Sequence, residues 1–222
     1  MTRKKRRDAV ENHERLLVAA FDILADRGPD LSVRETALRS GLGVGTAYRH
    51  FATHEDLIRA VYDRALTQVG AVLMQETAAD SAWGELCMRL ESVTLAIADV
   101  PAVRTVMRRM HEIDPSYSPA NAAAVVVARL IRAAEEEGTL RAGITPADLA
   151  VTAFALASLV GRPTELERAM LRRHLAIVLD GLRADGPSGE LPPSPMSIEE
   201  FHTFVHRANS PSLDYRHEGA GA

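Results

Sequence analysis

The stretch SVRETALRSGLGVGTAYRHF, residues 32–51, decides the fold. Ser32 is followed three residues later by Glu35, which is the pattern of a capping box at the start of an α-helix. This helix is predicted over residues 33–40 and ends at Gly41. A Gly-Leu-Gly turn follows, and a second short helix runs to the end of the stretch. Two short helices joined by a glycine-containing turn of three or four residues are typical of a helix-turn-helix unit.

The second of these helices carries an unusual set of residues for a core element. Ala47 and Phe51 are four residues apart and can face inward together. The residues left outside are small or form hydrogen bonds, and they are Gly45, Thr46, Tyr48, Arg49 and His50. Small residues let a helix lie close to a surface, and hydroxyl and guanidinium groups suit phosphate oxygens. The pattern favours a DNA groove as the partner. The alternative is an αα-hairpin with incidental polar residues.

Composition sets the class of protein. The chain has 222 residues, of which 46% are hydrophobic and 25% are charged, as in ordinary globular proteins. Alanine occurs 35 times while aromatic residues make up 5%, which favours an all-α fold. The net charge of −4 excludes a uniformly basic nucleic-acid coat. Residues 1–66 nevertheless hold 12 basic against 10 acidic residues, and this asymmetry indicates two separate roles.

Several classes of function are not expected. Cys87 is the only cysteine, so one chain can build neither a disulfide framework nor a thiolate-rich metal site, as is usual in a reducing cytoplasm. The chain has no glycine-rich phosphate loop and none of the common hydrolase signatures, so we do not expect an enzyme. No apolar run approaches the roughly 20 residues of a membrane span. We expect a cytoplasmic protein with no metal, no cofactor and no contact with a membrane.

Capping patterns and composition shifts predict how the chain is organised. Capping boxes at Thr53, Thr145 and Thr164 predict further helix starts. We expect the following segments: a basic flexible arm (1–11), a helix-turn-helix DNA-binding domain (12–53), a connecting helix (54–72), a helical ligand-binding and dimerisation domain (73–185), and a Pro-rich tail (186–222). Within the tail, residues 197–208 either form a short docked helix or are disordered.

Residues 12–66 resemble the DNA-binding region of the TetR family of transcriptional regulators. The resemblance is carried by RLLVAAF (15–21), Gly28, SVRETA (32–37), GLGVGTAYRHF (41–51) and EDL (55–57). It implies a homodimer with three small DNA-binding helices in each subunit and a larger helical domain that binds a small-molecule effector. The remainder of the chain resembles the family only in the number and order of its helices.

The same resemblance implies which residues meet DNA. Val44, Gly45 and His50 correspond to positions that contact base edges, and Thr46 and Tyr48 to positions that contact phosphates. Arg34 corresponds to a base or phosphate contact, and Arg49 matches the pattern with its target left open. His54 stands where lysine is common, and Thr36 and Ala47 replace larger aliphatic residues. The basic arm, with Lys4, Lys5, Arg6 and Arg7, can reach an adjacent minor groove or can simply be solvated.

Residue type suggests an effector pocket, because methionine and aromatic side chains adapt to irregular ligands. The candidates are Trp83, Cys87, Met88, Met107, Met110, His111 and Tyr117. Ordinary core packing is the alternative for each of them.

The last helices predict a subunit interface, because a helix that is apolar nearly all round must be covered on more than one side. The candidates are Phe154, Leu159, Leu171, Leu175, Val178 and Leu182, and an internal core helix is the alternative.

The sequence predicts a sequence-specific DNA-binding regulator. We expect a repressor that a small molecule releases from a near-palindromic double-stranded operator. The alternative is a helical ligand-binding or interaction module that does not bind DNA.

Overall fold

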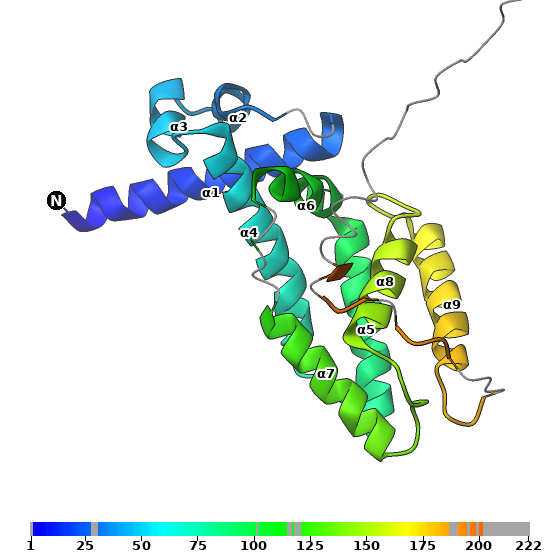
Figure 1. The fold of residues 1–222 in the computed structure, drawn as a ribbon. Helices are drawn as coiled ribbons and strands as arrows, with labels where there is room; N and C mark the ends of the chain where they lie inside the picture. The colour runs from blue at the N-terminus through cyan, green and yellow to red at the C-terminus, as the bar shows by residue number, and fades with distance from the viewer. Residues whose placement is uncertain are drawn as a thin grey trace, which may run out of the picture.

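The chain folds into α-helices in the computed structural model (Figure 1). The structure describes residues 2–27, 31–100, 102–114, 117, 121–186, 191–194, 196–198 and 200–201. Its helices are α1 (Thr2–Arg27), α2 (Val33–Ser40), α3 (Val44–His50), α4 (His54–Leu73), α5 (Ala82–Asp99), α6 (Ala102–Ile113), α7 (Asn121–Glu136), α8 (Pro146–Ala157) and α9 (Glu165–Gly181). Within these ranges the only extended pairing is an isolated bridge between Leu140 and Arg183. The predicted all-α fold is confirmed.

The predicted capping residues begin the helices. The Ser32 hydroxyl accepts a hydrogen bond from the Glu35 amide at 3.1 Å. Reciprocal capping boxes form at the starts of α4, α8 and α9, where the hydroxyls of Thr53, Thr145 and Thr164 accept from the amide three residues later. Each box satisfies amides of the first turn that have no partner within the helix.

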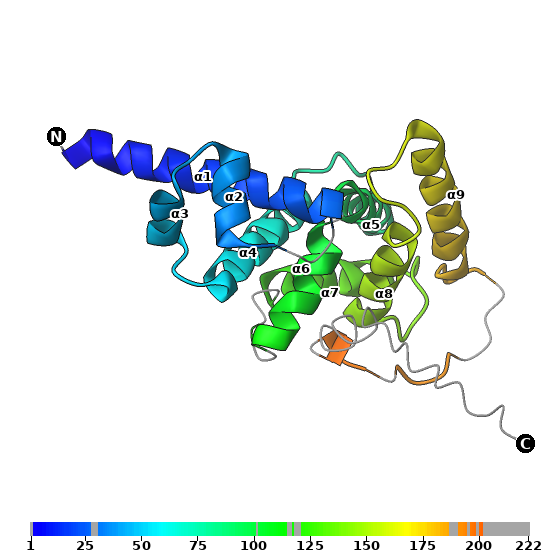
Figure 2. The same cartoon turned by 90° about the horizontal axis from the view of Figure 1, so that it is seen from above.

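The first helix differs from the prediction. The sequence predicts a separate flexible arm over residues 1–11, but residues 2–11 are the first turns of one continuous helix, α1, which ends at Arg27. The segment is rich in arginine and lysine and contains neither glycine nor proline, so it has high helix propensity. Figures 1 and 2 show the N-terminal end of α1 projecting beyond α2 and α3.

Two hydrophobic cores divide the helices. The first lies among α1, α2, α3, α4 and α6 and includes Phe51, Leu57 and Val61. The second lies among α5, α7, α8 and α9. Helix α4 packs against both α6 and α5, so it connects the two parts of the molecule. Figure 2 shows α1–α4 on one side and α5, α7, α8 and α9 on the other.

Part of the C-terminal tail returns to the body of the molecule. The Ser197 amide donates to the Glu200 carboxylate at 2.7 Å, and the Glu200 amide donates to the Ser197 hydroxyl at 3.2 Å. This turn carries Phe201, which is 1% exposed and belongs to the first core. Residues 202–208 of the predicted docked helix lie outside the described residues. No helix in the described ranges has the length and apolar character needed to span a membrane.

Candidate functional site

Helices α2 and α3 are held in a fixed relation by their turn. Gly41 ends α2 with φ of +70°, a left-handed conformation that favours glycine. The Leu42 amide donates to the Ala37 carbonyl at 3.0 Å, which closes the end of α2. From α1, Arg15 donates to the Ser40 carbonyl at 2.7 Å. The turn therefore directs α3 away from α2, and the hydrogen bond from Arg15 holds the end of α2 against α1.

Helix α3 buries one face and exposes the other. Ala47 is 0% exposed and Phe51 is 2% exposed, as their spacing predicts. Gly45, Tyr48 and Arg49 are exposed, and Tyr48 keeps 49% of its surface although it is a large aromatic residue. Figure 1 shows α3 at the outer edge of the molecule. The exposed face is therefore a candidate surface for a macromolecular partner.

Gly45 has no packing role in this structure. A Cβ added at Gly45 would meet no heavy atom within 4 Å, and Gly45 does not have a positive φ. Glycine in a helix costs about 1 kcal/mol relative to alanine. The fold alone does not explain this residue, whereas a partner that approaches the backbone closely would explain it.

The other predicted contact residues lie on α2, α3 and the start of α4. Arg49 Nη2 donates to the Thr46 hydroxyl at 2.9 Å, so two predicted contact residues already pair along α3. Arg34 is exposed in the first turn of α2, and His54 is half-buried at the start of α4. Val44 is half-buried and packs against the first core.

His50 lies at the end of α3 beside α1. Its ring centroid is 5.7 Å from that of His13, and both rings lie near Phe51. Burial lowers the pKa of His50 below 6.5, and His13 and Arg49 lower it further. The imidazole is therefore mostly neutral at pH 7.

The basic residues of the predicted arm are on the first turns of α1. Arg6 and Arg7 are exposed. The side chains of Lys4 and Lys5 lie outside the described part of the structure. A helical segment cannot follow a minor groove as an extended peptide does, so any contact from these residues comes from a helix end.

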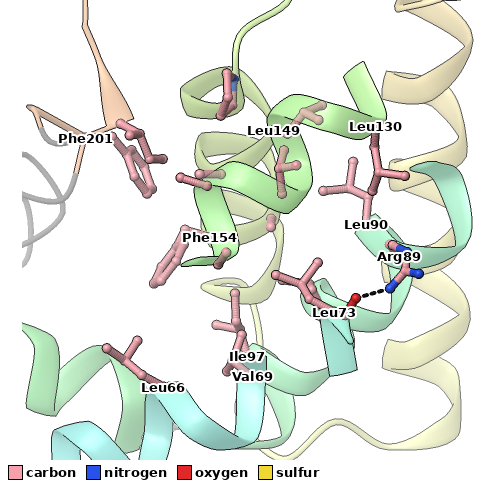
Figure 3. A pocket seen from close by; sticks show the side chains of 18 of the residues that line it. Leu66, Val69, Leu73, Arg89, Leu90, Ile97, Leu130, Leu149, Phe154 and Phe201 are labelled. Carbon is pink, nitrogen blue, oxygen red and sulfur yellow. Dashed lines mark hydrogen bonds between the residues drawn. The ribbon is translucent and has the colours of Figure 1, made fainter. Parts of the chain in front are cut away.

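A cavity of about 140 Å³ lies between α4, α5, α6, α7, α8 and the C-terminal turn (Figure 3). Its lining residues are Leu66, Val69, Leu73, Leu86, Arg89, Leu90, Val93, Ile97, Val103, Met107, Ala123, Ala124, Val127, Leu130, Pro146, Leu149, Ala150, Ala153, Phe154, Ile198 and Phe201. Arg89 is the one charged side chain that the described part of the chain contributes to this lining. Among the described residues, no three histidine, cysteine, aspartate or glutamate side chains group as metal ligands.

Most of the predicted pocket residues lie elsewhere. Met107 lines the cavity, but Met110 is buried in the first core. Trp83 and Cys87 pack on the second core, and Met88 is 38% exposed.

One further candidate, Tyr117, also falls outside the lining. Tyr117 donates a hydrogen bond to Asp63 at 2.7 Å, and the side chain of His111 lies outside the described residues. The prediction selected unusual residue types, whereas the cavity is lined by aliphatic residues that look like ordinary core. No sequence signal distinguishes the two.

Two residues of the predicted dimer interface are buried within one protomer. Leu171 and Leu175 are 1% and 2% exposed within one protomer, so they have no surface to offer a second one. Phe154 lines the cavity, and Val178 and Leu182 are half-buried. Of the predicted set, Leu159 is exposed, and the other exposed large apolar residues of α8 and α9 are Val151, Leu166 and Ile177. The prediction chose the strongest apolar stripe of α9, which faces the protomer's own core.

Comparison with known families gives two matches. Residues 16–61 match the family described as bacterial regulatory proteins, tetR family. Residues 81–184 match the C-terminal domain described as transcriptional regulator SbtR-like. The first match contains α2 and α3, and the second contains most of the cavity lining.

Curated relatives match over the DNA-binding part. An HTH-type transcriptional repressor of Mycobacterium tuberculosis is 41% identical over 66 residues, which is 29% of this chain and 35% of the relative. An HTH-type transcriptional regulator of Staphylococcus aureus is 36% identical over 84 residues, which is 36% of this chain and 44% of the relative. The chain thus spans less than half of the length of these relatives.

Solved structures extend the likeness to most of the chain. A TetR transcriptional regulator of Streptomyces coelicolor has a TM-score of 0.51 and 25% identity, covering 78% of this chain and 99% of its own. The ketosteroid transcriptional regulator KstR2 of Mycobacterium tuberculosis has a TM-score of 0.59 at 18% identity, covering 77% and 94%, which shows the fold alone. The two family matches, over residues 16–61 and 81–184, and the helix-turn-helix of α2 and α3 show that the chain belongs to the TetR family of DNA-binding transcriptional regulators, which are not enzymes.

Proposed function

We propose that the chain is a dimeric, cytoplasmic repressor that leaves a near-palindromic operator when a small molecule enters the α4–α8 cavity. The exposed face of α3 carries the DNA-binding part of this proposal. This face combines a glycine that the packing of the fold does not require, a half-exposed tyrosine and an arginine on one short helix.

The proposed DNA contacts follow from this face. Val44, Gly45 and His50 meet base edges in the major groove, and Thr46 and Tyr48 meet phosphates. Arg34, Arg49, His54 and the basic start of α1 (Lys4, Lys5, Arg6 and Arg7) add positive or hydrogen-bonding groups around them. Residues 12–53 form the DNA-binding domain, 54–72 the connection and 73–185 the effector and dimerisation domain.

Helix α4 supports the proposed coupling between effector and DNA. Leu57 and Val61 belong to the first core together with residues of α1, α2 and α3, while Leu66 and Leu73 on the same helix line the cavity. A ligand that shifts α4 would therefore also shift α3. Such a ligand changes DNA binding only if it binds the two conformations with unequal affinity.

Residues that follow α6 also contact α4. Arg59 lies 3.3 Å from the Asp114 carboxylate and stacks over the Tyr117 ring with 4.5 Å to its centroid. Tyr117 also donates to Asp63. These contacts attach the end of α6 to α4, so movement of either helix is passed to the other.

Recovery of bound genomic DNA followed by sequencing tests the proposal. The wild-type protein should enrich a small set of near-palindromic sites, and Tyr48→Ala should lose this enrichment while its circular dichroism stays unchanged. Enrichment of no sequence by the wild-type protein would favour a ligand-binding module instead.

A further inference from the structure

The wall of the α4–α8 cavity is almost entirely hydrocarbon. Among the described residues, leucine, isoleucine, valine, alanine, methionine, proline and phenylalanine supply every lining side chain except Arg89. A polar or charged ligand group that loses its water here finds few partners, and unpaired burial of such groups is strongly unfavourable. The lining therefore selects against ligands with several polar groups.

Arg89 is already neutralised by groups of the protein. Its Nε donates to Glu85 Oε1 at 2.8 Å, and its Nη2 lies 2.7 Å from the same oxygen. Its Nη1 donates to the Leu73 carbonyl at the end of α4, as Figure 3 shows. An anionic ligand would have to compete with the Glu85 carboxylate and the Leu73 carbonyl for this guanidinium.

We propose that this cavity binds an uncharged, predominantly hydrocarbon molecule and excludes carboxylates, phosphates and sulfonates. The inference rests on the proposed function, in which the cavity receives the effector, and it adds the chemical class of that effector.

The tail limits the size of the ligand. Ile198 and Phe201 form one wall, and Figure 3 shows Phe201 on the side of the cavity opposite Arg89. This wall lies beyond the matched C-terminal domain, which ends at residue 184. An engineered cavity of about 150 Å³ holds benzene, so the volume of about 140 Å³ fits one ring without any movement of the wall. A larger ligand displaces the wall, which is a single turn started by Ser197.

A matched pair of fluorescent probes tests the chemical class. N-phenyl-1-naphthylamine is neutral, and 8-anilinonaphthalene-1-sulfonate is the same skeleton with one sulfonate. Titration of the full-length protein without DNA should show saturable binding of the neutral probe. The sulfonate should bind at least about tenfold more weakly, a difference equal to about 1.4 kcal/mol.

Variants on α7 locate the binding. Ala124 lines the cavity, and its neighbour Val125 is 70% exposed. Ala124→Phe should weaken the neutral probe about tenfold or more by filling the cavity, whereas Val125→Phe should leave its affinity unchanged. Ala150→Met on α8 fills the same space and replaces Ala124→Phe if that variant does not fold.

Two results would overturn the proposal: equal or tighter binding of the sulfonate that a filling variant abolishes, or neutral-probe binding that no filling variant changes. Failure of the proposed function looks different. In that case the neutral probe binds in the cavity, but at saturation it does not alter the affinity of the protein for DNA.

Discussion

At the scale of single residues, Gly45 and His50 are the positions where we expect stability and DNA binding to respond in opposite directions. The buried face of α3, Ala47 and Phe51, follows from their spacing alone. The exposed face could be named from the sequence, but the reason for its glycine could not. The open space around Gly45 depends on how α3 sits against α1 and α2, which no local pattern encodes.

Gly45→Ala should make the protein more stable and weaken its binding to DNA. A methyl group in open space favours the helix by about 0.5 kcal/mol or more, but it would hold a DNA surface away from the backbone. We expect operator affinity to fall about tenfold. Urea unfolding and fluorescence anisotropy measure the two effects separately.

Gly70→Ala is the matched control for this substitution. Gly70 lies in α4, and a Cβ there also meets no atom within 4 Å. Gly70→Ala should raise stability and leave operator affinity unchanged. If Gly45→Ala binds the operator as tightly as this control does, Gly45 is not at the DNA interface.

His50 should give operator binding a pH dependence. Its lowered pKa leaves it mostly neutral at pH 7, and its protonated form adds a positive charge beside the DNA. Operator affinity should therefore rise as the pH falls from 7 toward the pKa of His50. Anisotropy titrations across this range should show a steeper rise for the wild-type protein than for His50→Gln. Equal slopes for the two proteins would show that His50 does not face DNA.

The stability of the fold should respond to His50 in the opposite direction. Unfolding restores the ordinary pKa of 6.5, so the unfolded chain binds the proton more readily than the folded chain. The contribution of His50 to stability is thus present above pH 6.5 and decreases as the pH falls through the window between 6.5 and the lowered pKa. Urea unfolding of the wild-type protein and His50→Gln at several pH values measures this contribution.

At the scale of elements, the sequence predicts where helices begin, but it does not predict which face of each helix is buried. Thr53, Thr145 and Thr164 carry local signals, and each forms its reciprocal cap. The composition of α1 also favours one continuous helix, but the run of basic residues at its start led to the prediction of a separate arm. The burial of Leu171 and Leu175 depends on which side of α9 meets α5 and α8, and periodicity does not specify that side.

The C-terminal turn should depend on one side chain. Phe201 is buried against Phe154, with ring centroids 5.6 Å apart. Truncating a buried phenylalanine costs about 3–5 kcal/mol in a core, but this turn can detach without unfolding the helices. Phe201→Ala should therefore accelerate hydrogen exchange at the amides of residues 200 and 201 more than it lowers the melting temperature.

Leu191→Ala is the control for this prediction, because Leu191 is 38% exposed and does not line the cavity. It should leave exchange at residues 200 and 201 unchanged. Unchanged exchange in Phe201→Ala itself would contradict the docking of the turn.

At the scale of the whole molecule, the exposed apolar residues of α8 and α9 mark the proposed dimer interface. Leu166 and Ile177 on α9 are 80% and 58% exposed, and Leu159 beyond α8 is 62% exposed. Large apolar side chains gathered on neighbouring elements indicate a protein interface. A symmetric pair of such faces would bury them and fix the separation of the two α3 helices.

Ile177→Asp should convert the dimer to monomers, because it places a charge in the centre of an apolar interface. Sedimentation velocity would report the mass, and operator affinity should fall as well. Val125→Asp, at a 70% exposed position of α7, should leave both unchanged. A dimer that persists in Ile177→Asp would place the interface elsewhere.

The proposed coupling between ligand binding in the cavity and operator binding at α3 acts through α4. It requires reciprocity: if a ligand weakens operator binding by some factor, the operator must weaken ligand binding by the same factor. Calorimetric titration of N-phenyl-1-naphthylamine into the free protein and into the protein saturated with operator DNA measures this factor. We predict weaker binding to the DNA complex, by the ratio in which the probe lowers operator affinity. Equal affinity for the free and DNA-bound protein would contradict the coupling.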